Sequence, residues 1–141
     1  MSAESSYVLH RFPETLSVVG MPPGTEVPGW AESSSVFSVT ATATETTIVC
    51  ARRSVPTKVK RAGPFTAFQV QGPLDFALTG VLSGLLAPLA EAGISVFTIS
   101  TFDTDWVLVP QDRADDAADE WRRRGHTVDH AVPVNLQERS R

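Results

Sequence analysis

Residues 65–110 read FTAFQVQGPLDFALTGVLSGLLAPLAEAGISVFTISTFDTDWVLVP and carry the clearest secondary-structure signals in the chain. Residues 65–70 have the composition of a strand, and Gly72-Pro73 then turns the chain. Apolar residues follow at helical spacing: Leu78, Val81, Leu82, Leu85, Leu86 and Leu89. Residues 94–101 alternate as a strand does, and residues 105–110 are apolar enough for a central strand, so together they predict a hairpin.

The residues after this stretch predict a second helix and a last strand. Asp112 is a suitable helix N-cap, and Gly125 suits the position just beyond the helix end. The face of this helix that we expect to be buried carries Ala114, Ala117, Ala118 and Trp121. Residues 127–132 follow as a strand. The order β-α-β-β-α-β predicts an α+β fold of the ferredoxin-like type.

The first sixty residues predict a β-rich half without a long amphipathic helix. Its four strand candidates are residues 7–12, 16–20, 36–42 and 46–51, with at most one helical turn around Trp30. This half resembles a shortened copy of the second half that lacks the long helices. We therefore expect a reduced half over residues 1–60, a ferredoxin-like domain over residues 61–133 and a flexible tail over residues 134–141.

Composition excludes several classes of protein. The 141 residues are 42% hydrophobic and 20% charged, as in ordinary folded domains, and the net charge of -4 gives no reason to expect nucleic acid. No secretory signal and no membrane span is predicted, because the longest apolar segment, residues 76–92, is interrupted by polar residues and proline. We therefore expect a cytoplasmic protein without a membrane partner. The single cysteine, Cys50, falls in a strand and is expected to be buried and inert.

The first candidate site is the turn formed by Thr101, Phe102, Asp103, Thr104 and Asp105, which concentrates hydroxyls and carboxylates between apolar strands. Hydroxyls and backbone groups can hold the carboxylate of an amino acid, and an aspartate can receive its ammonium group. The alternative is purely structural, because aspartates also close tight turns through side-chain to backbone hydrogen bonds.

The second candidate is the loop formed by Gly72, Pro73, Leu74, Asp75 and Phe76, which joins a strand to its helix. In a ferredoxin-like sheet such a loop places helix-terminal amides where they attract an anion, so an α-carboxylate would fit there. The structural alternative is that Asp75 only caps the helix.

Three segments, residues 72–80, 89–95 and 100–109, closely resemble bacterial ACT-domain proteins related to the CASTOR-type arginine sensor. Residues 37–40 and 48–50 are similar to the shortened N-terminal ACT-like half of those proteins. The resemblance implies a tandem ACT-like arrangement that binds a free amino acid at an interface between ACT units, with regulation as its output.

The resemblance also assigns roles to the two loops. It implies that residues 101–105 contact the ligand, that Asp105 matches an aspartate important for arginine recognition, and that residues 72–76 form the other wall. Asp103 and Thr104 differ from the sensor's residues at those positions, so an amino acid is implied without specifying arginine. We expect a homodimer, because ACT sheets and helices usually pair, and the regulatory output implies a regulated protein partner.

Catalysis is not predicted. The three histidines are scattered, and the sequence has no HxxH, CxxC or HExxH spacing for a metal and no glycine-rich phosphate loop. We therefore expect no cofactor, no metal and no enzyme activity. The alternative to a ligand sensor is an oligomerisation or protein-interaction module whose strand edges pair with another chain and whose turn binds nothing.

Overall fold

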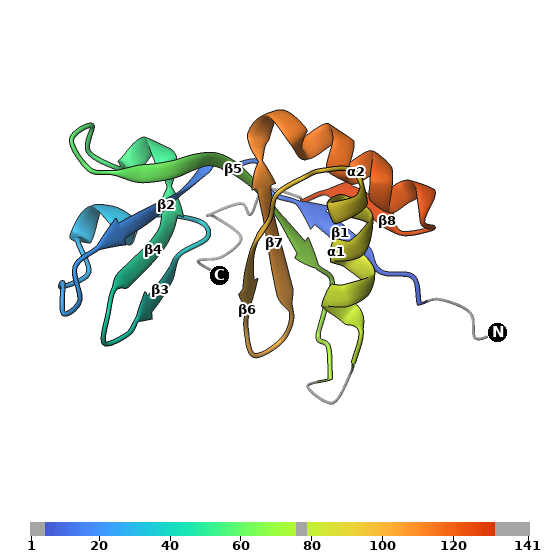
Figure 1. The fold of residues 1–141 in the computed structure, drawn as a ribbon, viewed down its shortest axis with the longest axis horizontal. Helices are drawn as coiled ribbons and strands as arrows, with labels where there is room; N and C mark the ends of the chain where they lie inside the picture. The colour runs from blue at the N-terminus through green and yellow to red at the C-terminus, as the bar shows by residue number, and fades with distance from the viewer. Residues whose placement is uncertain (1–4, 76–78, 132–141) are drawn as a thin grey trace, which may run out of the picture.

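The computed structural model describes residues 5–75 and 79–131, and in these residues all strands belong to one sheet (Figure 1). The strands are β1 (Val8–Arg11), β2 (Leu16–Met21), β3 (Ser38–Ala41), β4 (Thr46–Ala51), β5 (Arg61–Val70), β6 (Phe97–Ser100), β7 (Asp105–Pro110) and β8 (Thr127–His130). The helices are α1 (Val81–Glu91) and α2 (Ala114–Arg123), and single 3-10 turns occur at Gly29–Ala31, Arg52–Ser54 and Gln111–Arg113. The fold is α+β, as the sequence predicts.

The long strand β5 connects the two halves of the sheet. Its beginning pairs with β2, in a ribbon that continues through β4 to β3. Its end pairs with β1 on one side and β7 on the other, and β7 pairs in turn with β6. Figure 1 shows β5 running from the β-rich half into the half that carries both helices. The two halves of the sheet therefore share strand β5.

Strand β1 lies in the helix-bearing half, which differs from the expected grouping of residues 7–12 with the β-rich half. It pairs antiparallel with β5, Leu9 opposite Val70, and parallel with β8, Leu9 opposite Val128. Leu9 is fully buried. The physical reason is that β7 covers only one edge of β5, and β1, with Leu9 buried, pairs with the other edge. The proposed division after residue 60 is therefore crossed by β1.

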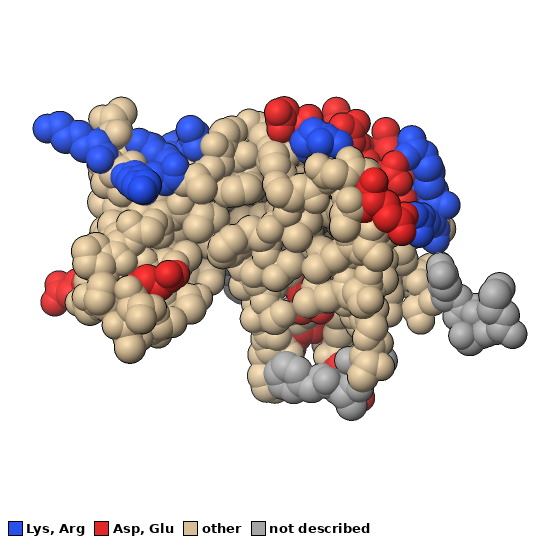
Figure 2. Space-filling view, in the orientation of Figure 1, with Lys and Arg blue, Asp and Glu red and all other residues tan. Residues whose placement is uncertain are grey.

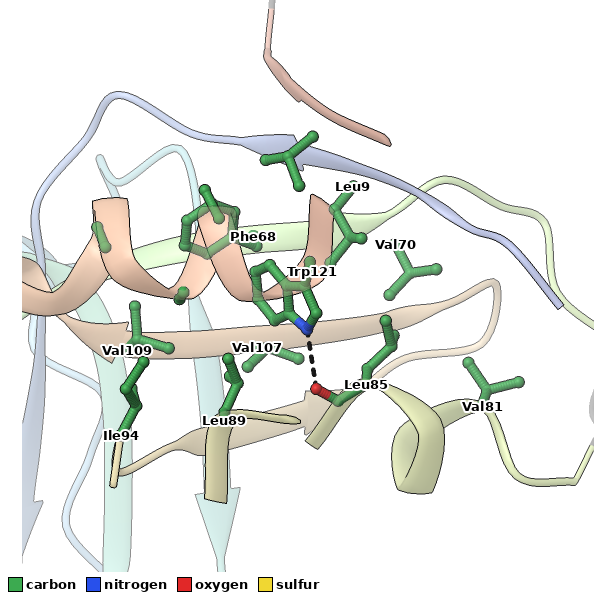
Figure 3. Close-up of a cluster of buried hydrophobic side chains, with 14 residues drawn as sticks. Leu9, Phe68, Val70, Val81, Leu85, Leu89, Ile94, Val107, Val109 and Trp121 are labelled. Atoms are coloured by element: carbon green, nitrogen blue, oxygen red, sulfur yellow. Dashed lines mark hydrogen bonds between the residues drawn. The ribbon is translucent and has the colours of Figure 1, made fainter. Parts of the chain in front are cut away.

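Both helices pack on one face of this part of the sheet and form the main core (Figure 3). Phe68 and Val70 of β5 and Val107 and Val109 of β7 alternate toward the helices. The inward face predicted for α2, Ala114, Ala117, Ala118 and Trp121, is buried. The Trp121 indole N–H donates a hydrogen bond of 2.8 Å to the Leu85 carbonyl, which ties α2 to α1.

The opposite face of the same strands contacts the β-rich half. Ala67 and Leu108 on this face form a buried cluster with Leu16, Val36 and Val49. The β-rich half has a further small core with Val19, Ala31, Ile48, Cys50 and Val55 as its buried members. The helical turn predicted near Trp30 is present at Gly29–Ala31.

Two helix starts differ from the sequence prediction. Asp112 does not cap α2: it lies in the 3-10 turn Gln111–Arg113, and the helix begins at Ala114 without a side-chain cap. The first helix begins at Val81, with Gly80 in the left-handed conformation before it, whereas the apolar spacing extends back to Leu78. Leu78 itself lies outside the described residues. Gly125 has positive φ just past α2, as predicted, and Gly93 has positive φ just past α1.

Candidate functional site

The two candidate loops meet at one end of the helix-bearing half. Figure 1 shows the β6–β7 turn and the connection between β5 and α1 side by side at the lower end of the sheet. The Leu74 amide donates a 2.6 Å hydrogen bond to the Asp103 carbonyl, and the buried Thr104 hydroxyl donates one of 2.5 Å to the Val70 carbonyl. A β-carbon at Gly72 would lie 2.9 Å from the Asp103 carbonyl oxygen, so only glycine allows this approach.

Threonines, rather than aspartates, close the β6–β7 turn. The Thr101 amide and hydroxyl both donate to the Thr104 carbonyl, at 2.8 and 3.0 Å, and the Thr104 amide donates to the Thr101 hydroxyl at 3.3 Å. The Asp105 carboxylate instead accepts a 2.7 Å hydrogen bond from the Ser100 hydroxyl. Asp105 therefore contacts its partner Ser100 across the base of the hairpin through side chains, instead of closing the turn through the backbone hydrogen bond that the structural alternative predicts.

A cavity of about 310 Å³ lies between the two loops and the first turn of α1. This volume is at the lower end of the range for small-molecule sites. Its lining residues come from the three elements: Leu74, Asp75, Gly80, Val81, Leu82, Ser83, Ser100, Thr101, Phe102, Thr104 and Asp105.

The charge around this cavity is acidic. The described lining includes the carboxylates of Asp75 and Asp105 and no Lys or Arg. On the face drawn in Figure 2, the exposed charge at this end of the molecule is likewise acidic. A cationic group is therefore favoured beside these two side chains.

The first turn of α1 supplies backbone amides that favour an anionic group. The amides of the first residues of a helix lack intrahelical acceptors and carry partial positive charge. Val81, Leu82 and Ser83 of this turn line the cavity, and no side chain caps the helix. The helix begins at Val81, six residues after Asp75, and its N-cap position is Gly80. The cavity thus combines two carboxylates with a helix N-terminus.

The structure separates the ten predicted site residues into three groups. Leu74, Asp75, Thr101, Phe102, Thr104 and Asp105 line the cavity. Gly72, Pro73 and Asp103 do not line it, although Gly72 and the Asp103 backbone bring the loops together. Phe76 lies outside the described residues.

Sequence reasoning missed the residues at the start of α1: Gly80, just before the helix, and Val81, Leu82 and Ser83 in its first turn. The apolar spacing extended the helix back to Leu78, which concealed where its first turn begins. Gly80 was the available signal, because a glycine in the left-handed conformation commonly interrupts a helical run.

Outside this cavity, the described residues offer neither a metal site nor a reactive thiol. Residues 5–75 and 79–131 contain no group of three His, Cys, Asp or Glu placed to hold a metal ion. Burial raises the pKa of the Cys50 thiol, and Glu14 raises it further, which disfavours the reactive thiolate. Within the same ranges, no helix has the length and apolarity needed to cross a membrane.

Solved structures with a similar fold include three of particular interest. Protein Atu0741 from Agobacterium tumefaciens is 28% identical with a TM-score of 0.84, covering 94% of this chain and 99% of that one. A Vibrio cholerae protein of unknown function is 16% identical with a TM-score of 0.63, over 82% and 89% of the two chains. The regulatory subunit of aspartate kinase from Thermus flavus is 11% identical with a TM-score of 0.54, over 88% and 99%.

Family comparisons match two consecutive segments of the chain. A search of curated proteins found no significant match. Residues 14–58 match a family described as an N-terminal domain, and residues 63–119 match the ACT domain family. The chain therefore contains an ACT domain, preceded by a β-rich N-terminal domain.

Proposed function

We propose that this protein binds a free amino acid in the cavity between the β5–α1 connection, the first turn of α1 and the β6–β7 turn, and that it acts as a metabolite sensor without catalysis. The observation that carries the proposal is the pairing of two carboxylates, Asp75 and Asp105, with the uncapped N-terminus of α1 in one cavity. A zwitterion presents an ammonium group and a carboxylate, and this pairing offers a partner to each.

The apolar part of the lining leaves room for a side chain. Leu74, Leu82 and Phe102 form apolar wall beside the polar groups. Small-ligand sites commonly combine such walls with a few placed polar groups. Micromolar affinity corresponds to a binding free energy of about -8 kcal/mol. An amino acid of about ten heavy atoms can reach it, because small ligands bind with at most roughly 1.5 kcal/mol per heavy atom.

Regulation rather than chemistry is the proposed output. The resemblance to the CASTOR-type arginine sensor supports it, and the fold shared with aspartate kinase regulatory subunits is compatible with it. The differences at Asp103 and Thr104 leave the identity of the amino acid to experiment.

The proposal includes a homodimer that closes the cavity. Phe102, at the cavity wall, is 80% exposed, and a second copy seated on this end would remove it from water. Light scattering with ligand present is expected to give about twice the chain mass of 15.2 kDa. Without ligand the average mass should be lower at the same protein concentration, because a ligand that binds the dimer favours it. A mass of one chain at all concentrations, with and without ligand, would contradict the dimer.

The test of ligand binding is a titration calorimetry screen of the twenty amino acids, followed by two matched variants. Asp105→Asn removes a charge from the cavity, and we expect it to weaken binding about ten-fold or more. Asp103→Asn removes the same charge from the same turn but outside the lining, and should change affinity less than about two-fold.

Two results would overturn the proposal. Equal affinity in both variants would place the ligand elsewhere. If no amino acid bound at millimolar concentration while a protein partner did, the interaction-module alternative would replace the sensor.

A further inference from the structure

The connection between β4 and β5, residues 52–61, gathers positive charge at one end of the β-rich half, and we call it the basic loop. It holds both lysines of the chain, Lys58 and Lys60, with Arg52 before them and Arg61 after them. The two lysines are exposed and the two arginines are half-buried. Figure 2 shows Lys and Arg side chains together at this end of the β-rich half, with acidic side chains elsewhere on the same face.

These four cations have no carboxylate within ion-pair distance among the described residues. The Arg52 guanidinium donates to the Ser17 hydroxyl at 3.2 Å, and the Arg61 guanidinium donates only to backbone carbonyls, which leave its charge uncompensated. The arginines described in the helix-bearing half differ, because each of them pairs with an Asp or Glu: Arg11, Arg113, Arg122, Arg123 and Arg124.

The Arg61 side chain holds the basic loop in shape. It donates to the carbonyls of Val55, Pro56 and Thr57 at 3.3, 3.0 and 2.9 Å. The Val59 amide also donates to the Pro56 carbonyl at 3.0 Å, which closes the turn that precedes the second lysine. Because the backbone is already tied down, a partner loses less conformational entropy when it binds this loop.

The placement of these charges is unfavourable for the isolated chain. Like charges that lie close together repel one another. The chain has 16 Asp and Glu against 12 Lys and Arg, so its composition supplies enough carboxylates to pair with every cation. The fold nevertheless leaves four cations of one loop without them. Such a surface favours a negatively charged partner, whose approach it speeds and whose position it fixes.

The rest of the molecule limits how long this partner can be. The end that carries the ligand cavity is acidic, and so is the first turn of α2, with Asp115 and Asp116. A long polyanion such as a nucleic acid gains affinity from basic groups spread along its backbone, and beyond the basic loop it would meet these carboxylates. A short anionic segment meets only the loop.

We infer that the basic loop is the docking surface for a short acidic segment of a partner protein. Asp and Glu side chains of that segment pair with the four cations of the loop. Trp30 and Val59, which are half-buried on the small core of the same half, offer an apolar contact beside them. This inference does not depend on an amino acid in the cavity of the ACT domain.

The experiment is fluorescence anisotropy of the full chain with a short labelled peptide of aspartate and glutamate around one leucine. We expect saturable binding that weakens as sodium chloride is raised, because salt screens exposed charges. A peptide with asparagine and glutamine in place of the acids should not bind. The double variant Lys58→Gln/Lys60→Gln should weaken binding about five-fold or more. Its thermal unfolding should match wild type, because both side chains are exposed.

The matched control is Arg123→Gln/Arg124→Gln, which also removes two positive charges, but from arginines that pair with Glu120 and Glu91. It should change affinity less than about two-fold, because carboxylates already neutralise those arginines. No binding of the acidic peptide, equal binding of the neutral peptide, or equal weakening by the two double variants would each overturn the inference. Tighter binding of a DNA duplex or of phosphatidylserine vesicles through the same lysines would also overturn it, in favour of that partner.

Discussion

The carboxylate of Glu14 fastens the chain just before β2 to two later parts of the N-terminal domain. One oxygen accepts from both the amide and the hydroxyl of Ser35, each at 2.7 Å, and the other accepts from Arg53 at 3.1 Å. Burial by itself would raise the pKa of Glu14, but the hydrogen bonds from Ser35 and the charge of Arg53 outweigh it and lower that pKa. The ionised form of the Glu14 carboxyl is therefore more stable, relative to the protonated form, in the folded protein than in the unfolded chain.

This lowered pKa predicts an acid-dependent stability difference. A carboxyl whose pKa is depressed on folding contributes stability above its ordinary pKa, and that contribution is lost as the pH falls through the folded value. Glu14→Gln should therefore lower the free energy of unfolding by about 1 kcal/mol at pH 7. The difference from wild type should shrink as the pH falls below the ordinary pKa of a glutamate and through the lowered pKa of Glu14. Urea unfolding across this range measures it.

Glu32→Gln is the control for this prediction, because Glu32 is exposed on the same domain. It should leave stability within about 0.5 kcal/mol of wild type at every pH. A Glu14→Gln deficit that stayed constant into acid would show that the side chain acts through packing instead of charge.

Individual site residues were predictable where local chemistry distinguishes them. Asp105 and Thr101 stood out because the turn concentrates hydroxyls and carboxylates between two apolar strands, and both line the cavity. Asp103 has the same local signal but does not line it. The direction of each side chain in a tight turn depends on which hydrogen bonds close that turn. Here Thr101 and Thr104 close it, and the spacing of residues in the sequence does not reveal this.

At the scale of elements, Gly72 is critical because it lies where the β5–α1 connection contacts the β6–β7 turn. A β-carbon there would lie 2.9 Å from the Asp103 carbonyl and 3.2 Å from the Thr104 β-carbon. Gly72→Ala must therefore separate the loops that form the cavity. We expect a loss of about 1 to 3 kcal/mol in stability and weaker ligand binding, measured by chemical unfolding and calorimetry.

Gly84→Ala is the matched control for Gly72→Ala. Its β-carbon meets no neighbour within 4 Å, and alanine favours a helix interior by about 1 kcal/mol over glycine. It should therefore raise stability slightly and leave affinity at the cavity unchanged. Equal effects of the two substitutions would show that the loops do not touch as described.

Several elements could be predicted from the sequence with their bounds. The strands at residues 46–51 and 105–110 have the predicted limits, because turn residues border each apolar run sharply. The buried face of α2 followed from its spacing, since alanines and Trp121 recur at helical intervals. Helix starts were not predictable in this way: α1 and α2 both begin without a side-chain cap, so no cap residue marks them.

At the scale of the whole molecule, the position of β1 was beyond local reasoning. Its pattern predicts a strand, but its partners β5 and β8 lie about 60 and 120 residues later in the chain. Periodicity gives the faces of a strand and not its neighbours. The strand and helix patterns predicted a β-rich first part and a helix-bearing second part, but they did not predict the crossing of β1 into the ACT sheet.

The inserted strand predicts that the ACT segment does not fold alone. A fragment of residues 61–141 lacks β1, so β5 loses an antiparallel partner and β8 loses a parallel one. We expect no cooperative thermal unfolding by circular dichroism, and recovery when a peptide of residues 5–15 is added. The control is a chain lacking only residues 134–141, which should unfold cooperatively. A fragment that melts like the full chain would mean that β8 pairs directly with β5.

The insertion of β1 also orders events during biosynthesis. A ribosome makes β1 before any of its neighbours, at about 5 to 20 residues per second, so this segment waits several seconds for β5 and β8 to emerge. Until then its apolar side chains are available to chaperones or to other nascent chains. Completion of the ACT sheet thus brings the earliest strand and the last strand of the described chain together in a single closing step.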